Sequence, residues 1–199
     1  IGVPGNPRNI TPSNIQAMPT WYEARVCSKG YQGRRGGVDM MVAMNPQTWD
    51  ADIAEIEPGG YLFYDSTRVM PKSKFREDIN VIGIPLTEIS NNAYADARER
   101  QLFKNIIYVG ALSVLLDVEA SVFEKLFAEQ YKGKERLLAS NIRALNLGRD
   151  YVKQHIAAPL GIRVARSDRV GDQIFTDGNS AAALGFIYGG ATVAAWYPI

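Results

Sequence analysis

The sequence predicts an α/β protein with a mostly parallel sheet in its first half and a helical part after it. Short apolar runs at residues 38–44 and 80–84 lack strict alternation, which is typical of strands covered on both faces. These runs alternate with helical patterns, which favours crossovers between parallel strands. From residue 94 to residue 155 the pattern is helical. Together these observations define the class.

The first predicted strand covers residues 21–27, which are rich in aromatic and β-branched side chains. The second strand, 38–44, leads into a predicted helix at 47–57. Asn45 is a favourable cap for that helix, because its side chain accepts a hydrogen bond from the first turn, and Pro46 is tolerated there. Pro58-Gly59-Gly60 marks the predicted end of the helix.

The next predicted elements are a strand at 61–64, a short helix at 72–77 and the strand at 80–84. Three helices are then predicted from the 3.6-residue periodicity. They are placed at 94–117, 118–131 and 135–155.

Residues 161–172 are polar and short of large apolar side chains, which is the composition of a linker. The predicted domain organisation is therefore 1–160, a linker at 161–172, and a second unit at 173–199. That unit has a predicted strand, a helix of small residues capped by Asp177 or Asn179, and a second strand. These elements are too few to bury a core, so we expect them to begin a larger domain.

Composition excludes some classes of protein. A net charge of +1 on 199 residues, without a basic aromatic face, argues against nucleic-acid binding. No apolar stretch approaches the roughly 18 residues of a membrane helix, and no secretory signal is visible. Cys27 is the single cysteine, which suits a reducing compartment. We therefore expect a soluble cytoplasmic protein.

The sequence carries few residue patterns that are typical of catalytic sites. One cysteine cannot supply the roughly four thiolates of an iron–sulfur cluster, and no zinc or phosphate-loop spacing occurs. Gly59-Gly60 followed by Asn91-Asn92 lacks the aspartate of a thiamine diphosphate motif and is rejected. The carboxylate pairs Asp50/Asp52 and Asp96/Glu99 are poor candidates for acid–base work. His155 is interpreted as a residue of a helix end.

Arg34 and Arg35 form the candidate anion site. They lie in the glycine-rich turn GRRGG, whose backbone N–H groups could cradle a phosphate. The alternative, which we weigh more heavily, is that both arginines are solvated in a surface turn.

Three segments resemble a known family: NIQAMPTWYEARV, DMMVAMNPQTWDADIAEIEPGGYLFYDST and TDGNSAAALGFIYGGATVAAWYPI. They are similar to the alpha subunit of 2-oxoacid:ferredoxin oxidoreductases, in the form with a gamma domain fused ahead of the alpha domain, as in 2-oxoglutarate enzymes. The resemblance covers essentially the whole chain. It implies a gamma-type domain and then the first strand-helix-strand of a thiamine-enzyme pyrimidine-type domain, with the chain truncated at both ends. The family continues with Thr-Pro-Ser after Ile199.

The resemblance also implies a chemistry. The whole complex would decarboxylate a 2-oxoacid with thiamine diphosphate and Mg²⁺, pass electrons through an iron–sulfur cluster to ferredoxin, and leave the acyl group on coenzyme A. A beta subunit would hold the cofactors, so this chain alone would bind none and be inactive. Tyr197, Pro198 and Ile199 match positions beside the active site, with core and turn packing as their alternative role. The competing hypothesis is a non-catalytic α/β module that binds a nucleotide or coenzyme A, or assembles subunits.

Overall fold

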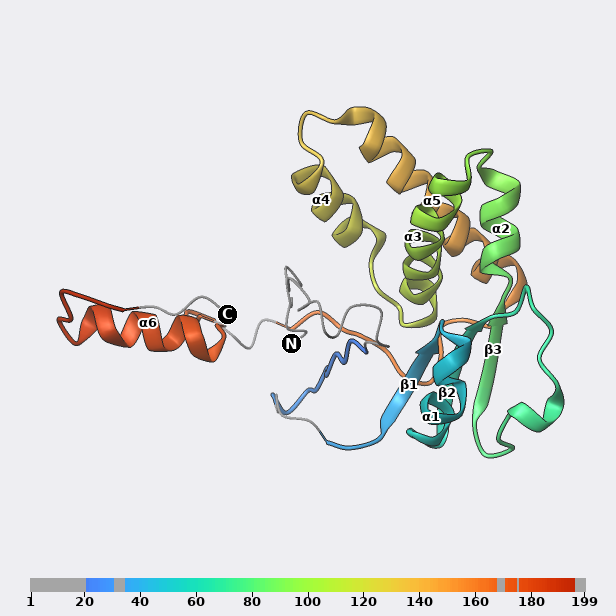
Figure 1. The fold of residues 1–199 in the computed structure, drawn as a ribbon, viewed down its shortest axis with the longest axis horizontal. Helices are drawn as coiled ribbons and strands as arrows, with labels where there is room; N and C mark the ends of the chain where they lie inside the picture. The colour runs from blue at the N-terminus through green and yellow to red at the C-terminus, as the bar shows by residue number, and fades with distance from the viewer. Residues whose placement is uncertain (1–20, 31–34, 168–170, 175, 196–199) are drawn as a thin grey trace. The chain divides into compact units, whose positions relative to one another are not determined.

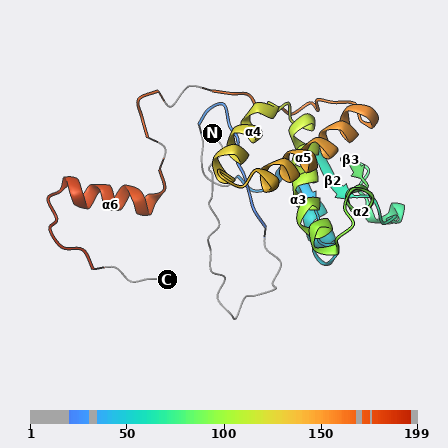
Figure 2. The same cartoon turned by 90° about the horizontal axis from the view of Figure 1, so that it is seen from above.

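The computed structural model describes residues 21–30, 35–167, 171–174 and 176–195 (Figures 1 and 2). The chain forms two compact units, Ile1–Ala165 and Arg166–Ile199. The described part of the first unit contains a small parallel sheet and five α-helices. The predicted α/β class, with a parallel sheet, is confirmed.

The sheet consists of β1 (Val38–Ala43), β2 (Ile56–Asp65) and β3 (Asn80–Ile84), in the order β1-β2-β3. Both pairings are parallel, so the carboxyl ends of all three strands lie at one edge. The predicted strand at 80–84 has the predicted bounds. The one at 38–44 ends one residue early.

Both faces of the sheet are covered, as the apolar runs predicted. Leu62 and Phe63 are consecutive in β2, so they point to opposite faces, and both are fully buried. Leu62 belongs to a cluster with Trp49 and Ile53 of α1 (Trp49–Ala54), while Phe63 belongs to the larger cluster formed with the following helices. The sheet is therefore the middle layer of this unit.

The predicted helix at 47–57 is wrong in its second half. A 3-10 turn at Pro46–Thr48 leads into α1, which ends at Ala54, and β2 already begins at Ile56. The glycine pair does not end a helix but forms a bulge in β2, because Gly59 has a φ of +79° and a Cβ at Gly60 would overlap neighbouring backbone. The pairing register with β1 shifts at this bulge.

Two further predictions require correction. The predicted helix at 72–77 is only a 3-10 turn at Lys72–Lys74 within the connection from β2 to β3. Residues 21–27 form no strand, and the side chains of Trp21, Tyr22 and Val26 are largely exposed. Residue types that favour strands need a half-buried pleated surface, and no described strand pairs with this segment.

Four helices follow the sheet (Figure 1): α2 (Leu86–Ala93), α3 (Ala97–Leu115), α4 (Ala120–Gln130) and α5 (Glu135–His155). The bounds of α5 were predicted correctly, whereas α2 was missed. Helices α3 and α5 pack with close backbone approach, because a Cβ at Gly110 would overlap the Leu145 carbonyl oxygen and one at Gly148 that of Ile107. Ser113 of α3 adds a hydrogen bond between the two helices, since its hydroxyl accepts from Arg149 of α5 (2.5 Å). The same hydroxyl donates to Gly110 O (2.6 Å).

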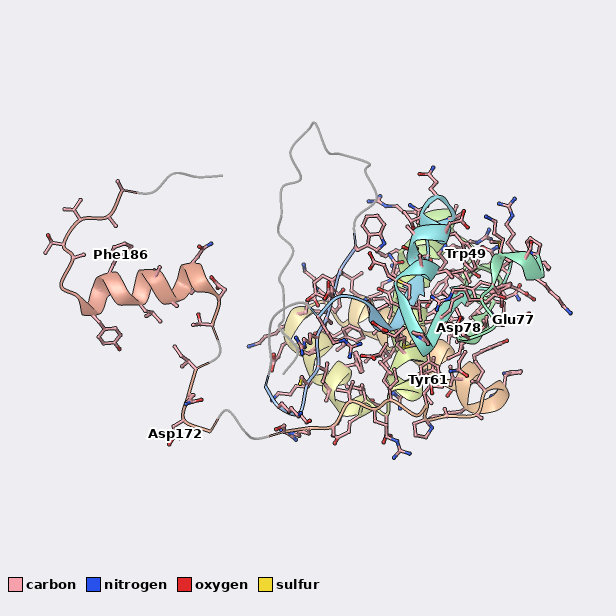
Figure 3. All side chains as sticks on the ribbon, turned by 90° about the horizontal axis from the view of Figure 1, so that it is seen from below. Trp49, Tyr61, Glu77, Asp78, Asp172 and Phe186 are labelled. Atoms are coloured by element: carbon pink, nitrogen blue, oxygen red, sulfur yellow. The ribbon has the colours of Figure 1, made fainter. Side chains whose placement is uncertain are left out.

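The regular element in the described part of the second unit is α6 (Gly178–Tyr188). Of the two predicted caps, Asp177 and Asn179, it is Asp177 that caps α6, by accepting the backbone N–H of Ser180 at 2.9 Å. The predicted strands on either side are not present in the described residues 171–174, 176, 177 and 191–195; the remaining residues of those segments lie outside the described ranges. Phe186, labelled in Figure 3, is 61% exposed, and none of the residues of α6 is buried.

Candidate functional site

The carboxyl ends of β2 and β3 carry a cluster of polar side chains, at the edge where parallel sheets commonly bind ligands. Asp65 ends β2, and Thr87 follows β3 in the first turn of α2. Thr87 Oγ1 donates to Asp65 Oδ2 at 2.5 Å, and Thr67 Oγ1 donates to Asp65 Oδ1 at 2.7 Å. The parallel register of β2 and β3 brings these three side chains together.

Asp65 caps α2 from another part of the chain. Pro85 stands at the cap position of α2 and makes no side-chain cap hydrogen bond. Asp65 Oδ1 accepts the backbone N–H of Thr87 (3.3 Å), and Thr67 Oγ1 accepts that of Glu88 (3.1 Å). The negative charge also suits the positive end of the helix dipole. The backbone N–H groups of Thr87 and Glu88 at the start of α2 are thus already engaged.

The environment of Asp65 favours the ionised carboxylate. Burial would raise the pKa of Asp65, but hydrogen bonds from Thr87 and Thr67 outweigh burial and hold the pKa below its usual value. Lys104 of α3 lies beside this carboxylate, with its Nζ 4.0 Å from Asp65 Oδ2 and 3.5 Å from Thr87 Oγ1. Within this cluster, the Lys104 ammonium is the group with spare donors for an anion.

A second polar cluster lies at the start of α1, just beyond the carboxyl end of β1. Asn45 caps the first turn, as predicted, by accepting the N–H of Gln47 at 3.0 Å. Asp52 is only 3% exposed, and its two carboxyl oxygens accept from Trp21 Nε1 (2.6 Å) and from Thr48 Oγ1 (2.8 Å). No sequence motif pointed to this cluster, because Trp21 lies far from Asp52 in the chain.

The predicted anion site is only partly described, because Arg34 lies outside the described residues. Arg35 is exposed and its guanidinium pairs with Asp39 at 3.0 Å. Glu57 also lies against Gly37 of the same turn, since its side chain occupies the space of a Cβ there. These two carboxylates place negative charge beside Arg35 and Gly37, so an anion at Arg35 would compete with Asp39.

Tyr197, Pro198 and Ile199, predicted to lie beside an active site, are outside the described residues. His155 is at the end of α5, with Nδ1 2.9 Å from the Tyr151 carbonyl oxygen and its ring stacked on Tyr151. This confirms the helix-end interpretation. Cys27 is half-buried.

The predicted carboxylate pairs do not form acid–base sites. Asp50 is exposed and pairs with Lys74 at 2.8 Å, while Asp52 is buried on another side of α1. Asp96 caps α3 by accepting the backbone N–H of Arg98 and of Glu99, both at 2.9 Å. Asp50, Asp52 and Asp96 are thus engaged in an ion pair or in hydrogen bonds.

An open groove of about 610 Å³ lies along α5. None of the predicted site residues lines it. Its lining residues are Glu135, Leu138, Ala139, Ile142, Arg143, Asn146, Leu147 and Asp150.

Two general features of the described ranges bear on function. In these ranges, His, Cys, Asp and Glu side chains do not gather in groups of three or more that could hold a metal ion. Among the helices that the structure describes, none combines the length and the apolar character of a membrane span.

Two known proteins that are similar to this chain are both subunits of oxidoreductases. The chain is 25% identical over 225 residues to subunit alpha of 2-oxoacid:ferredoxin oxidoreductase 2 from Aeropyrum pernix, an alignment that covers 94% of this chain and 35% of that protein. It is 27% identical over 126 residues to the ketoisovalerate oxidoreductase subunit VorA of Methanothermobacter thermautotrophicus, covering 61% of this chain and 24% of that subunit.

A solved structure is also similar. The 2-oxoglutarate:ferredoxin oxidoreductase from Magnetococcus marinus, determined with 2-oxoglutarate, coenzyme A and succinyl-CoA bound, matches with a TM-score of 0.64 and 26% identity. The match covers 78% of this chain and 27% of that one. The chain thus spans about a third or less of the length of these proteins. The family model for pyruvate ferredoxin/flavodoxin oxidoreductase matches residues 6–151, and the chain belongs to this family.

Proposed function

We propose that this chain is part of an enzyme complex that oxidatively decarboxylates a 2-oxoacid and transfers electrons to ferredoxin. The reaction converts a 2-oxoacid and coenzyme A into an acyl-CoA, carbon dioxide and a proton, while two ferredoxins each accept one electron. The match that spans 94% of this chain and an alpha subunit of such an enzyme is the observation that carries the proposal.

The substrate in this proposal is 2-oxoglutarate. The similar solved structure is that of a 2-oxoglutarate enzyme, and it aligns with 78% of this chain. A ketoisovalerate enzyme subunit matches over a shorter stretch, 61% of the chain, so a branched 2-oxoacid is the competing substrate. The assay must therefore compare several 2-oxoacids.

The cofactors and partners follow from the same proposal. Thiamine diphosphate with Mg²⁺ and the iron–sulfur cluster would belong to a beta subunit, as the resemblance to the alpha subunit of this family implies. The one cysteine of this sequence is also too few to ligate a cluster. In the sequence, Tyr197, Pro198 and Ile199 would lead into the active site of the complete protein. Residues 1–160 would be a gamma-type domain, 161–172 a linker, and 173–199 the start of the catalytic alpha domain. The complex would be cytoplasmic.

The test starts from the natural complex, purified through an affinity tag on this chain. We expect a beta subunit to co-purify and the complex to reduce ferredoxin only when coenzyme A and a 2-oxoacid are both present. Rates with 2-oxoglutarate, pyruvate and 2-oxoisovalerate then identify the substrate, and a faster rate with either of the last two would overturn 2-oxoglutarate. Absence of both a partner subunit and any ferredoxin reduction would overturn the proposed function.

A further inference from the structure

One face of α4 carries apolar side chains that the described part of the chain leaves exposed. Val122, Leu126 and Glu129 recur at helical spacing with Lys125 beside them, and these four residues form the α4 ridge. Val122 is 45% exposed and Leu126 is 53% exposed. Within the described ranges, none of the residues of α4 is buried. An apolar face that its own chain leaves exposed is typical of a surface that meets a partner.

The groove along α5 has the shape and the charges to receive such a ridge. Its apolar lining includes Leu138 and Ile142, which are half-buried. The charged lining residues Glu135, Arg143 and Asp150 alternate in sign and lie roughly 10–12 Å apart along the helix, at about 1.5 Å per residue. A helix ridge with apolar side chains and one carboxylate opposite Arg143 therefore fits this groove.

Arg143 is already held in position at the groove. Its Nη2 donates to the Ala93 carbonyl oxygen at 3.2 Å, and its guanidinium carbon lies 5.3 Å from the centroid of the Tyr94 ring. A guanidinium carries about five N–H donors, so the contact with Ala93 leaves several for a carboxylate. Binding a carboxylate here would cost little side-chain entropy, because the guanidinium is already placed.

We propose that the α4 ridge of one copy docks into the α5 groove of a second copy, and the reverse, so that two copies form a symmetric dimer. Ridge and groove lie on the same chain, so a single twofold arrangement covers both ridges and fills both grooves. Glu129 placed opposite Arg143 of the partner subunit brings Lys125, one turn away, towards an acidic end of the same groove. The inference is independent of the proposed function, because it rests on residues of α4 and α5.

Sedimentation velocity of the full chain tests the dimer. We expect association at about 100 μM, a concentration at which an interface with a Kd of about 10 μM would be mostly occupied. Glu129→Lys and Arg143→Glu each place like charges at both contacts, so each should weaken association at least about tenfold. An equimolar mixture of the two variants should associate again, because together they restore opposite charges at both contacts.

Glu124→Lys is the matched control, because it makes the same change of charge on α4 outside the ridge and should associate like the wild type. Circular dichroism checks the fold of each variant, and Leu126→Ala, which should also weaken association, tests the ridge without touching Arg143. A monomeric wild type at about 100 μM would overturn the proposal and make another protein chain the partner of this surface. Wild-type association of Glu129→Lys would overturn it too, as would a mixture of folded variants that stays monomeric.

Discussion

Helices α5 and α6 both contain alanine, glycine and aliphatic residues, but these residues have different surroundings in the two helices. In α5, the side chains of Ala144, Leu145 and Val152 are at most 1% exposed, and Gly148 lies against the backbone of α3. In α6, Ile187 is 70% exposed and a Cβ at Gly185 would meet nothing within 4 Å. The environment, and not the residue type, therefore decides whether a small helix residue is a packing element.

The difference follows from patterning. α5 carries its apolar residues as one stripe with charged residues on the other faces, so the stripe selects one partner, α3. α6 has apolar and small residues on every side. Their spacing does not define one apolar face that would pack against a core. In the described residues, α6 is held by local interactions: the Asp177 cap and a C-terminal turn in which Ala191 N donates to Phe186 O.

The largest expected effect comes from filling the close contact between α3 and α5. Gly148→Ala places a methyl group against the Ile107 carbonyl, so the helices must separate, and we expect a loss of about 3 kcal/mol in the free energy of unfolding. Urea denaturation measures this loss. Gly185→Ala in α6 is the control, where alanine meets open space and should increase helical circular dichroism. A Gly148→Ala variant as stable as the wild type would contradict the close packing.

A smaller effect is expected at the cap of α2. Asp65→Asn removes the negative charge at the helix start, so we expect a loss of about 1 kcal/mol at pH 7. The folded state lowers the pKa of Asp65, so its contribution is present above the unfolded-state pKa of about 4. That contribution is lost as the pH falls through the lower, folded-state pKa.

The difference between wild type and Asp65→Asn should therefore narrow when unfolding is measured from pH 7 down to about pH 3. A difference that stays constant over this range would show that charge is not the cause. Asp177→Ala is the counterpart in α6, where the cap is local. It should lower the helical signal of α6 without changing the unfolding of the sheet.

The smallest effect concerns the helix ends. α3 is followed by Asp117 at a φ of +59°, whereas α6 is followed by Gly190 at +81°. Glycine adopts this left-handed conformation without a Cβ penalty, so Asp117→Gly should stabilise the first unit by about 0.5–1 kcal/mol. Gly190→Ala should have the opposite effect on α6 helicity. Destabilisation by Asp117→Gly in urea would mean that the aspartate side chain matters more than its backbone strain.

The sequence predicted elements whose signals are local. The strand at Asn80–Ile84 is a compact apolar run, and α5 has a continuous stripe between clear ends, so their bounds agree with the structure. Asp177 likewise stands next to the helix that it caps. Signals of this kind lie within a few residues of the element that they specify.

The elements that were missed depend on distant residues. α2 is capped by Asp65, 22 residues before Thr87, so its own sequence carries no start signal. The bulge of β2 depends on pairing with β1, and Asp52 accepts a hydrogen bond from Trp21, 31 residues away. Tertiary contacts therefore determine these features, which the local propensities of the sequence do not specify.

The most direct test of the central claim measures carbon dioxide release from a 2-oxoacid labelled at its carboxyl carbon. The complex purified through this chain should release labelled carbon dioxide from 2-oxoglutarate, with coenzyme A and ferredoxin needed for sustained turnover. The isolated chain should release none. Absence of release from the complex with any 2-oxoacid would contradict the proposed function, and release by the isolated chain would contradict its role as one part of a larger enzyme.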